Sequence, residues 1–481
     1  MRRNPTFFDR APETADIEGA LASKRSELRI VYGRRGAGKS TLFEHVFDGK
    51  PHFSYTCTQR VLSLQLADIE RALGDFAPGA MVGRLTTFDD FLAVLATLAA
   101  RTPKQSLSVV IDELPYLARE DKGVLGDLQR WFNAQKRAGV NNLKIFLLGS
   151  MVSWMQEQAL SDTAALKSVR TGQLAVHPLT YRHAAGFYSA WSPDDKVRAF
   201  GIWGGLPGAV SEVSGRASLW KNLEATTLTR GAKLYEEPDW LQYTDLRGNA
   251  LYSSIVRAVA SGERKPSDIA HFVASSAQTQ IQPYLEKLRD AQILERRAPM
   301  LAKEERPRSS LYYVSDQFLA YWYRFVNPER SSLDRGLRAR PLKRIREGLD
   351  KYISEDTFVT ISRTYLWEAL ATRRLPRTLQ FDRVGGWWSG RGQSQNEADV
   401  VAYAGKELVL IGECKWSNSQ ANEGDLRGLD KLLRDFAAEL VPSKTVWRAL
   451  FSRAGFSDGL TRLARKSNER LLLVEPSDLY W

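Results

Sequence analysis

The sequence GRRGAGKS at residues 33–40 begins at the end of the apolar segment ELRIVYG and opens GKSTLFEHVF, which has the pattern of a helix. Its spacing, Gly33 and then Gly38-Lys39-Ser40 after four residues, is the P-loop pattern in the strand-to-helix context that this loop requires. Glycines let main-chain N–H groups point at phosphates, and the helix N-terminus adds partial positive charge. The stretch therefore predicts an α/β nucleoside-triphosphatase fold.

The loop has expected partners on ATP and Mg²⁺. Lys39 would reach the β- and γ-phosphates, and the Ser40 hydroxyl would bind the magnesium ion. An incidental glycine-rich turn is the alternative. The residues expected to surround the phosphates are Gly33, Arg34, Arg35, Gly36, Ala37, Gly38, Lys39, Ser40 and Thr41.

Two adjacent acids end the apolar segment SLSVVIDEL at residues 106–114. In an open parallel sheet, an acid at the end of a strand lies at the edge where ligands bind. Asp112 would hold the magnesium ion through water, and Glu113 would orient or deprotonate the attacking water. The alternative is that a strand-end acid caps a helix. The acid pair favours an ATPase, and the Asn-Lys-x-Asp element that recognises guanine is absent.

Two more residues are candidates for contact with the nucleotide. Ser150 ends the apolar segment LKIFLLGS and would sense the γ-phosphate from a neighbouring strand. Arg170, in SVRTG, would reach the charge of the transition state, although a surface arginine fits the sequence equally well.

The order of apolar and amphipathic segments predicts several domains. Up to about residue 180, buried strands alternate with helices, which indicates a parallel sheet covered on both faces. Helical segments follow, then three helices and a hairpin in the order of a winged helix-turn-helix, then an Arg-rich helix and a second α/β region. The expected domains are a P-loop ATPase core at 1–180, a helical lid at 181–245, a winged helix-turn-helix at 246–328, a basic helical connector at 329–360 and an α/β tail at 361–481.

The predicted winged helix suggests a DNA contact. Its third helix, TQIQPYLEKLRDAQ, would be the recognition helix, with Gln280, Gln282, Lys287 and Arg289 facing bases or phosphates. The alternative is a module that only packs between its neighbours. The connector that follows would bind phosphate or form a solvated helix face; its cations are Arg335, Arg338, Arg340, Lys343, Arg344 and Arg346.

A second candidate site lies in the tail, in the segment IGECKW at residues 411–416. In a strand, Glu413 and Lys415 share one face and Cys414 points the other way, toward the core. A hairpin loop of residues 405–407 would place Asp399 directly opposite Glu413, while a loop one residue longer would move it to the wrong face. Asp399 and Glu413 would then bind Mg²⁺, and Lys415 would orient the attacking water. A cross-strand ion pair is the alternative.

Composition and net charge exclude some classes of protein and favour others. The chain has 481 residues, a net charge of +12, a sequence pI of about 9.5 and two cysteines. The charge favours a polyanionic partner, and two cysteines exclude a disulfide framework or a Cys-rich zinc site. No apolar run is long enough to cross a bilayer and the start lacks a signal peptide, so we expect a cytoplasmic protein without a membrane partner.

Several segments together resemble the archaeal-type P-loop ATPases of the STAND/AAA+ group. In the first part these are FFDRAPETADIEGAL, GRRGAGKSTL, VVIDELPYL, FLLGS, SVRTGQLAVHPLTYRHA and GIWGGLPGAV; in the last part they are DQFLAYWYRFVNP, GGWW, EADVVAY and GECKW. The resemblance implies a restriction-endonuclease-like tail of the PD-(D/E)XK type, with Glu368 or Glu397 as a further metal ligand. It also implies that Arg10 lies near the base and that residues 205–207, including Pro207, contact the nucleotide. Ala398 stands where such families more often have a large aliphatic residue.

The expected function is that of a switch protein that binds and hydrolyses ATP with Mg²⁺ and couples its nucleotide state to a magnesium-dependent DNA nuclease. Two alternatives stay open from the sequence. One is a DNA-binding ATPase or regulator with an inactive tail, and the other is a signalling scaffold that forms homo-oligomers on ATP.

Overall fold

The structure is a computed structural model, and it describes residues 10–79, 83–236, 238, 250–273, 281–301, 309–389, 396–466 and 470–481. The chain divides into two compact units. The first contains residues 1–179 with 206–208 and 290–292, and the second contains the rest up to residue 481. The finer domain boundaries expected within the second unit stay predictions.

The first unit contains a five-stranded sheet in the order β2-β3-β4-β1-β5, in which all paired strands are parallel. The predicted parallel α/β sheet is therefore confirmed. The strands are β1 Glu27–Tyr32, β2 Phe53–Thr56, β3 Leu107–Asp112, β4 Leu143–Gly149 and β5 Gly172–Ala175.

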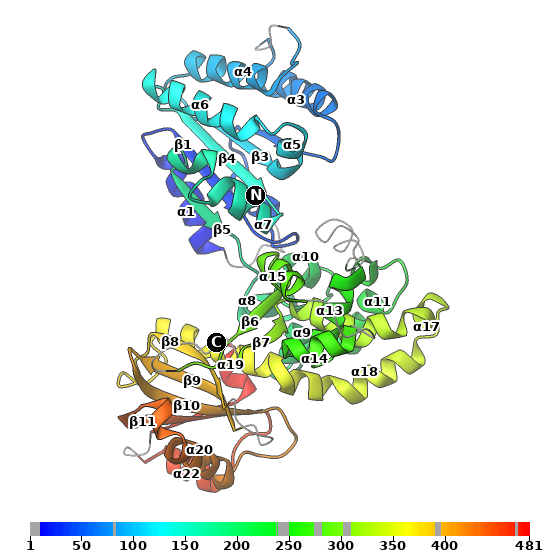
Figure 1. Cartoon of the computed structure of the whole chain (residues 1–481), viewed down its shortest axis with the longest axis vertical. Helices are drawn as coiled ribbons and strands as arrows, with labels where there is room; N and C mark the ends of the chain where they lie inside the picture. The colour runs from blue at the N-terminus through cyan, green and yellow to red at the C-terminus, as the bar shows by residue number, and fades with distance from the viewer. Residues whose placement is uncertain are drawn as a thin grey trace. The chain divides into compact units, whose positions relative to one another are not determined.

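Helices cover both faces of this sheet because its central strands are apolar on both sides. β3 and β4 are buried along their whole length. One face packs against α3, α4 and α6, and on the other face Phe43 of α2 packs edge-on against Phe146 of β4 (Figure 1). The helices of this unit are α1 Ala11–Ala22, α2 Lys39–Val46, α3 Leu62–Phe76, α4 Phe88–Arg101, α5 Leu114–Glu120, α6 Val124–Arg137 and α7 Val152–Trp154, followed by η1 Met155–Leu160 and η2 Ala165–Ser168.

Strand order decides which residues meet at the functional edge. β4 lies between β1, which leads into the P-loop, and β3, which ends in Asp112. The carboxyl ends of parallel strands lie at one edge of the sheet. Ser150 after β4 is therefore placed between the P-loop and the acid pair.

The second unit begins with short helices and continues with three helices and a hairpin. β6 and β7 pair antiparallel directly after α15 along the chain. Its helices before the second sheet are α8 Tyr181–Ala184, η3 Ala185–Tyr188, α9 Pro193–Trp203, α10 Pro207–Val210, α11 Leu219–Thr227, α13 Ala250–Ala260, α14 Pro266–Val273, α15 Gln282–Asp290, α16 Gln317–Tyr321, η5 Trp322–Val326, η6 Asn327–Glu329, α17 Arg330–Asp334, α18 Ala339–Tyr352, η7 Ile353–Thr357 and α19 Phe358–Ala371, and the hairpin strands are β6 Leu294–Arg297 and β7 Leu311–Val314.

A mixed five-stranded sheet closes the chain, in the order β12-β11-β10-β9-β8. β8, β9 and β10 are antiparallel neighbours, whereas β11 and β12 run parallel to β10. Leu426 and Leu429 of α20 pack on one face, and Tyr365 of α19 packs against Phe451 on the other (Figure 1). The elements are β8 Arg383–Trp388, β9 Glu397–Ala404, β10 Glu407–Lys415, α20 Glu423–Asp435, α21 Ala437–Leu440, β11 Pro442–Ser452, α22 Asp458–Ala464, β12 Leu471–Val474 and η8 Pro476–Leu479.

One carboxylate joins three distant segments of this unit. Asp350 of α18 accepts hydrogen bonds from Arg198 of α9 at 2.8 and 3.1 Å, from Arg453 at 2.9 Å and from the Trp416 indole at 3.1 Å. Arg453 also donates to Asp194 at 2.7 Å. Although burial opposes ionisation, the hydrogen bonds and nearby arginines hold the pKa of Asp350 below its ordinary value. α9, α18 and the last sheet therefore share one charge network.

Candidate nucleotide site and acidic site

The P-loop has the backbone conformation that its glycines predict. Gly36 and Gly38 have φ angles of 79° and 88°, in the left-handed region that glycine tolerates best. α2 begins directly after Gly38, so the first N–H groups of the helix point back toward the loop. The Lys39 ammonium donates to the main-chain oxygens of Gly33 at 2.7 Å and Arg34 at 3.3 Å.

Ser40 and the first strand-end acid are in direct contact. The Ser40 hydroxyl donates to Asp112 Oδ2 at 2.7 Å, and the Asp112 side chain is buried at the end of β3. A hydroxyl and a carboxylate at this separation can share one Mg²⁺ ion, either directly or through water. The structure thus brings together the two residues expected to hold magnesium at the nucleotide.

Glu113 has an unusual backbone for a residue other than glycine. Its φ and ψ angles are 54° and 39°, a left-handed conformation with a cost of order 1–3 kcal/mol. Its N–H donates to Asp112 Oδ1 at 2.8 Å, and its carboxylate accepts from the Ser150 hydroxyl at 2.7 Å. Ser150, expected at the γ-phosphate, is therefore in contact with the expected general base.

Two segments that are distant in sequence form hydrogen bonds with main-chain carbonyls of the P-loop. Arg10 is only 6% exposed, and its guanidinium donates to the Ala37 carbonyl at 2.8 Å and to Glu13 at 2.8 Å. The N–H of Gly208 donates to the carbonyl of Gly36 at 2.9 Å. A Cβ atom on Gly38 would lie 3.4 Å from Pro207 Cγ. Pro207 and Gly208 therefore contact the loop, and of these two the sequence predicted only Pro207.

Arg170, considered for contact with the transition-state charge, has main-chain partners in the structure. Its guanidinium donates to the main-chain oxygens of Leu160 at 2.7 Å and Ala159 at 3.4 Å, where it closes the end of η1. The role of Arg170 on the nucleotide stays a prediction. Thr41 lies in the first turn of α2, and the roles of Thr41, Arg34 and Arg35 on a nucleotide stay predictions.

The pairing register of β9 and β10 determines which residues meet in the second candidate site. The turn between the strands is Gly405-Lys406, one residue shorter than the expected loop of residues 405–407, which is a correction. A bulge at Val409 compensates, because the register shifts between Leu408 and Leu410. From Leu410 onward the pairing continues to Gly412 opposite Val400, so the next residues, Glu413 and Asp399, face each other across the end of the ladder.

Asp399 and Glu413 lie close enough for their charges to interact. Burial raises the pKa of Glu413 to about 7, and the charges of Asp399 and Asp425 add to that rise. Burial also raises the pKa of Asp399 to about 6, although its carboxylate accepts a 2.9 Å hydrogen bond from the Cys414 N–H. Paired, partly desolvated carboxylates of this kind are typical of cation sites and of acid–base sites. The half-buried Cys414 lies beside Ser362 of α19, on the opposite face from Glu413.

Lys415 has a partner that the sequence analysis did not identify. Its ammonium pairs with both carboxylate oxygens of Asp425 at 2.8 Å. Asp425 also accepts from the Asn422 N–H at 2.8 Å in the capping box that begins α20. An acid three residues after Asn422 signals such a cap, but nothing in the local sequence shows that it reaches β10.

Glu368, expected as a further metal ligand, has a basic partner in the structure, and its role at the acidic site stays a prediction. Its carboxylate pairs with Arg182 of α8 at 3.3 Å. The alternative, Glu397, lies two residues before Asp399 on β9, and its charge contributes to the raised pKa of both Asp399 and Glu413. Within the described ranges of the chain, no group of three or more His, Cys, Asp or Glu side chains is arranged to hold a metal ion.

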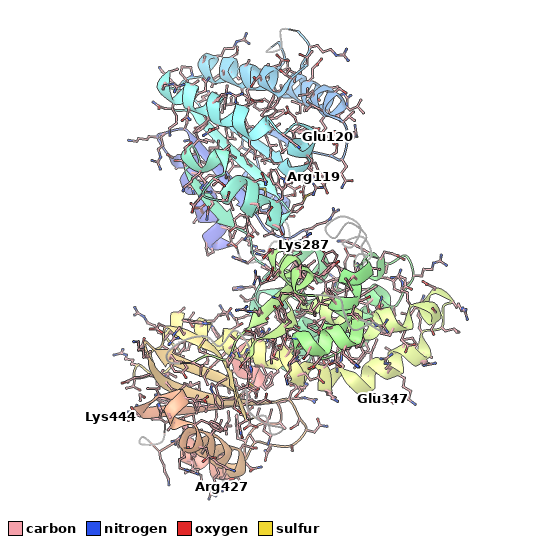
Figure 2. All side chains as sticks on the ribbon, in the orientation of Figure 1. Arg119, Glu120, Lys287, Glu347, Arg427 and Lys444 are labelled. Atoms are coloured by element: carbon pink, nitrogen blue, oxygen red, sulfur yellow. The ribbon has the colours of Figure 1, made fainter. Side chains whose placement is uncertain are left out.

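The expected DNA contacts lie on exposed surfaces. Lys287 projects from α15 and Arg289 is also exposed, whereas Gln282 donates to Glu286 at 3.3 Å (Figure 2). Gln280 lies outside the described residues. On α18, Arg344 pairs with Glu329 at 2.8 Å and Lys343 lies 3.8 Å from Glu347, as in a solvated helix face. In the described part of the chain, no helix is long and apolar enough to cross a membrane.

We expect the stability of the metal-free protein to fall as pH rises through the acidic site. Asp399 and Glu413 have ordinary pKa values of 3.8 and 4.5, and folding raises them to about 6 and about 7. A carboxyl group with a raised pKa stabilises the folded state while it is protonated and loses that contribution as it ionises. Urea unfolding in EDTA should therefore show a decline from pH 4.5 to pH 7, less steep in Glu413→Gln and reversed by Mg²⁺. An identical slope in wild type and Glu413→Gln would contradict the assignment.

Comparison with known families gives two matches. Residues 7–213 match an ATPase domain found predominantly in Archaea, and residues 322–426 match a family of archaeal and bacterial proteins of unknown function. The first range contains the whole nucleotide site up to Gly208. The second contains Asp399, Glu413, Lys415 and Asp425.

Individual proteins are also similar to this chain. An uncharacterized protein of Methanocaldococcus jannaschii is 25% identical over 430 residues, which make up 89% of this chain and 90% of that protein. A Walker-type ATPase of Pyrococcus abyssi is similar in fold, with a TM-score of 0.52, 18% identity and coverage of 67% of this chain and 97% of its own. The ORC2 protein of Aeropyrum pernix, in its ADPNP-ADP complexes, gives a TM-score of 0.43 at 15% identity over 69% of this chain and 93% of its own.

Proposed function

Since residues 7–213 form an ATPase domain of the archaeal type, we propose that the chain binds and hydrolyses ATP and that its nucleotide state controls a magnesium-dependent DNA nuclease in the second unit. The observation that supports this proposal is that Glu413 lies close enough to Asp399 and Lys415 for their charges to interact, in a chain that also holds a P-loop site.

The nucleotide site fits ATP and Mg²⁺. Lys39 now donates to the carbonyls of Gly33 and Arg34, and phosphate oxygens would take their place. Ser40 and Asp112 would hold Mg²⁺, which supplies charge neutralisation on the β- and γ-phosphates. Glu113, fixed at the adjacent edge by Ser150, would orient the attacking water and accept its proton.

The acidic site fits a magnesium ion held by few protein ligands. Mg²⁺ keeps several waters and commonly takes only one or two carboxylates, as Asp399 and Glu413 would supply. Bound metal supplies a Lewis acid for the phosphodiester group. Lys415, held by Asp425, would contribute a fixed positive charge beside the attacking water.

Control by the nucleotide would pass along the chain at residues 206–208. Gly208 donates to the P-loop carbonyl of Gly36, and the residues on either side of this segment belong to the second unit. A phosphate that reorganises the loop would change this hydrogen bond and so act on the polypeptide that leads into the second unit.

The test is an assay of the full chain on supercoiled plasmid and on ATP. We expect nicking or linearisation that requires Mg²⁺, is abolished by EDTA and differs between ATP, ADP and no nucleotide. Phosphate release from ATP should require the same metal. Intact plasmid under every nucleotide condition would refute the nuclease, and absence of phosphate release with and without DNA would refute the ATPase.

A second candidate function is a DNA-binding ATPase with a catalytically inactive tail. It is supported by the ion pair of Glu368 with Arg182, which would compete with a metal ion for that carboxylate, and by the order α13, α14, α15, β6, β7, which is that expected of a winged helix. Under this proposal, DNA binding would weaken steeply with salt, and Lys287→Ala would reduce the salt dependence by about one phosphate contact.

A further inference from the structure

The β8–β9 pair has an irregularity at the acid of the second site. Gly385 pairs with Val401 and Trp387 with Ala398, so that two residues of β9, Asp399 and Val400, face the single residue Gly386 of β8. Bulges of this kind re-aim side chains and leave main-chain groups without a ladder partner. The main-chain carbonyl of Asp399 lies at this point of the sheet.

Arg363 of α19 donates hydrogen bonds to that carbonyl. Its Nε and Nη2 atoms donate to Asp399 O at 2.8 and 2.6 Å. Two parallel N–H groups on one oxygen hold it more tightly than a single donor, and only the arginine fork provides them. The guanidinium passes over Gly386, where a Cβ atom would collide with Nη2. The glycine in β8 and the arginine in α19 are therefore two parts of one arrangement.

Asp399 also accepts a hydrogen bond at its side chain. The antiparallel ladder of β9 and β10 ends at Gly412, and beyond it the Cys414 N–H donates to Asp399 Oδ2 at 2.9 Å. Asp399 is thus fixed at its carbonyl from α19 and at its carboxylate from β10. Movement at the carbonyl would turn the carboxylate away from Cys414 and from Glu413.

We propose that Arg363 is a positioning residue for the acidic site, acting through the Asp399 carbonyl at the Gly386 bulge. The consequence of this positioning for metal binding rests on the proposed nuclease function. The effect of Arg363 on the Asp399 carboxylate does not depend on that function. Replacing a residue that orients a metal ligand through a hydrogen bond commonly changes metal affinity 10- to 100-fold. A residue that only attaches α19 to the sheet would not act selectively on Cys414.

The chain offers a matched pair of glycines for the test. Gly386→Ala would displace the Arg363 guanidinium and break its bonds to Asp399. Gly385→Ala, one residue away, would place its Cβ 2.7 Å from the flexible end of Met300 and should leave Arg363 in place. Arg363→Lys keeps the charge and loses the fork. The readouts are amide hydrogen exchange at Cys414, thermal unfolding and binding of Mn²⁺ at the site that Glu413→Gln removes.

We expect Gly386→Ala and Arg363→Lys to speed exchange at Cys414 by about 10-fold or more and to weaken Mn²⁺ binding by about 10- to 100-fold. Gly385→Ala should stay within about twofold of wild type in both. Unchanged Cys414 exchange in both variants, or faster exchange spread evenly over the second unit, would overturn the proposal. Faster Cys414 exchange with no Glu413-dependent Mn²⁺ site in wild type would support the positioning role and refute the metal site.

Discussion

Replacement of Glu113 by glutamine should lower the rate of ATP hydrolysis by roughly 10²- to 10⁴-fold, the range for loss of a general base. Glutamine keeps the size of the side chain and its ability to accept from Ser150, but it cannot take a proton from water. Binding of ATP should change little, because the phosphate contacts of the loop are untouched. Phosphate release and equilibrium binding of a fluorescent ATP analogue would measure the two effects separately.

Two further variants separate the parts of this site. Lys39→Ala should lose nucleotide binding itself, since it removes the cation expected on the β- and γ-phosphates. Ser150→Ala should have a smaller effect on turnover than Glu113→Gln, because it removes only the 2.7 Å hydrogen bond that holds the Glu113 carboxylate. If Glu113→Gln hydrolysed ATP at the wild-type rate, Glu113 would not be the general base.

Glu413→Gln should lower magnesium-dependent DNA cleavage by roughly 10²-fold or more, because even residues that only orient a metal ligand change metal affinity or activity 10- to 100-fold. Asp399→Asn should have an effect of the same order. Both replacements keep the shape of the side chain and remove a charge that Mg²⁺ would need. The measurement is the rate of plasmid nicking at saturating Mg²⁺ in the ATP condition that gives the highest wild-type rate.

Glu407→Gln provides a control on the same strand. Glu407 begins β10 at the exposed turn and pairs with Ala404, six residues from Glu413. Its replacement should leave cleavage at the wild-type rate, and ATP hydrolysis should be unchanged in all three variants if the two sites are chemically separate. Cleavage that survives in Glu413→Gln would indicate a contaminating nuclease or a different site.

The nucleotide site could be predicted from sequence because its parts are local or lie at strand ends. The P-loop spacing predicts its own backbone, and apolar strands followed by Asp112 or Ser150 predict one shared edge. The left-handed backbone of Glu113 could not be predicted, since Glu rarely adopts it and the compensating bond comes from Ser150, 37 residues away.

The acidic site was predictable only in part. Period-two alternation places Glu413 and Lys415 on one face, but Asp399 reaches its place through a shorter turn and a bulge at Val409. The expected loop was one residue too long, and the expected strand lacked the bulge. These two errors cancel, so the predicted pairing of Asp399 with Glu413 is unchanged. The β8 strand escaped prediction because its Gly-Gly-Trp-Trp sequence lacks alternation. The partners of Glu368 and Lys415 depend on how α8 and α20 pack.

The charge network at Asp350 bears on how the second unit could be divided. A cut at residue 360 would separate Trp416 and Arg453 from the Asp350 carboxylate that both contact, and would also separate Arg453 from Asp194. The fragment that carries the acidic site would then lack Asp350, the hydrogen-bond partner of Trp416 and Arg453 beside the end of β10. A piece that keeps all these contacts of the last sheet must carry α8, α9 and α18 with it, so we expect a break between α18 and α19 to be poorly tolerated.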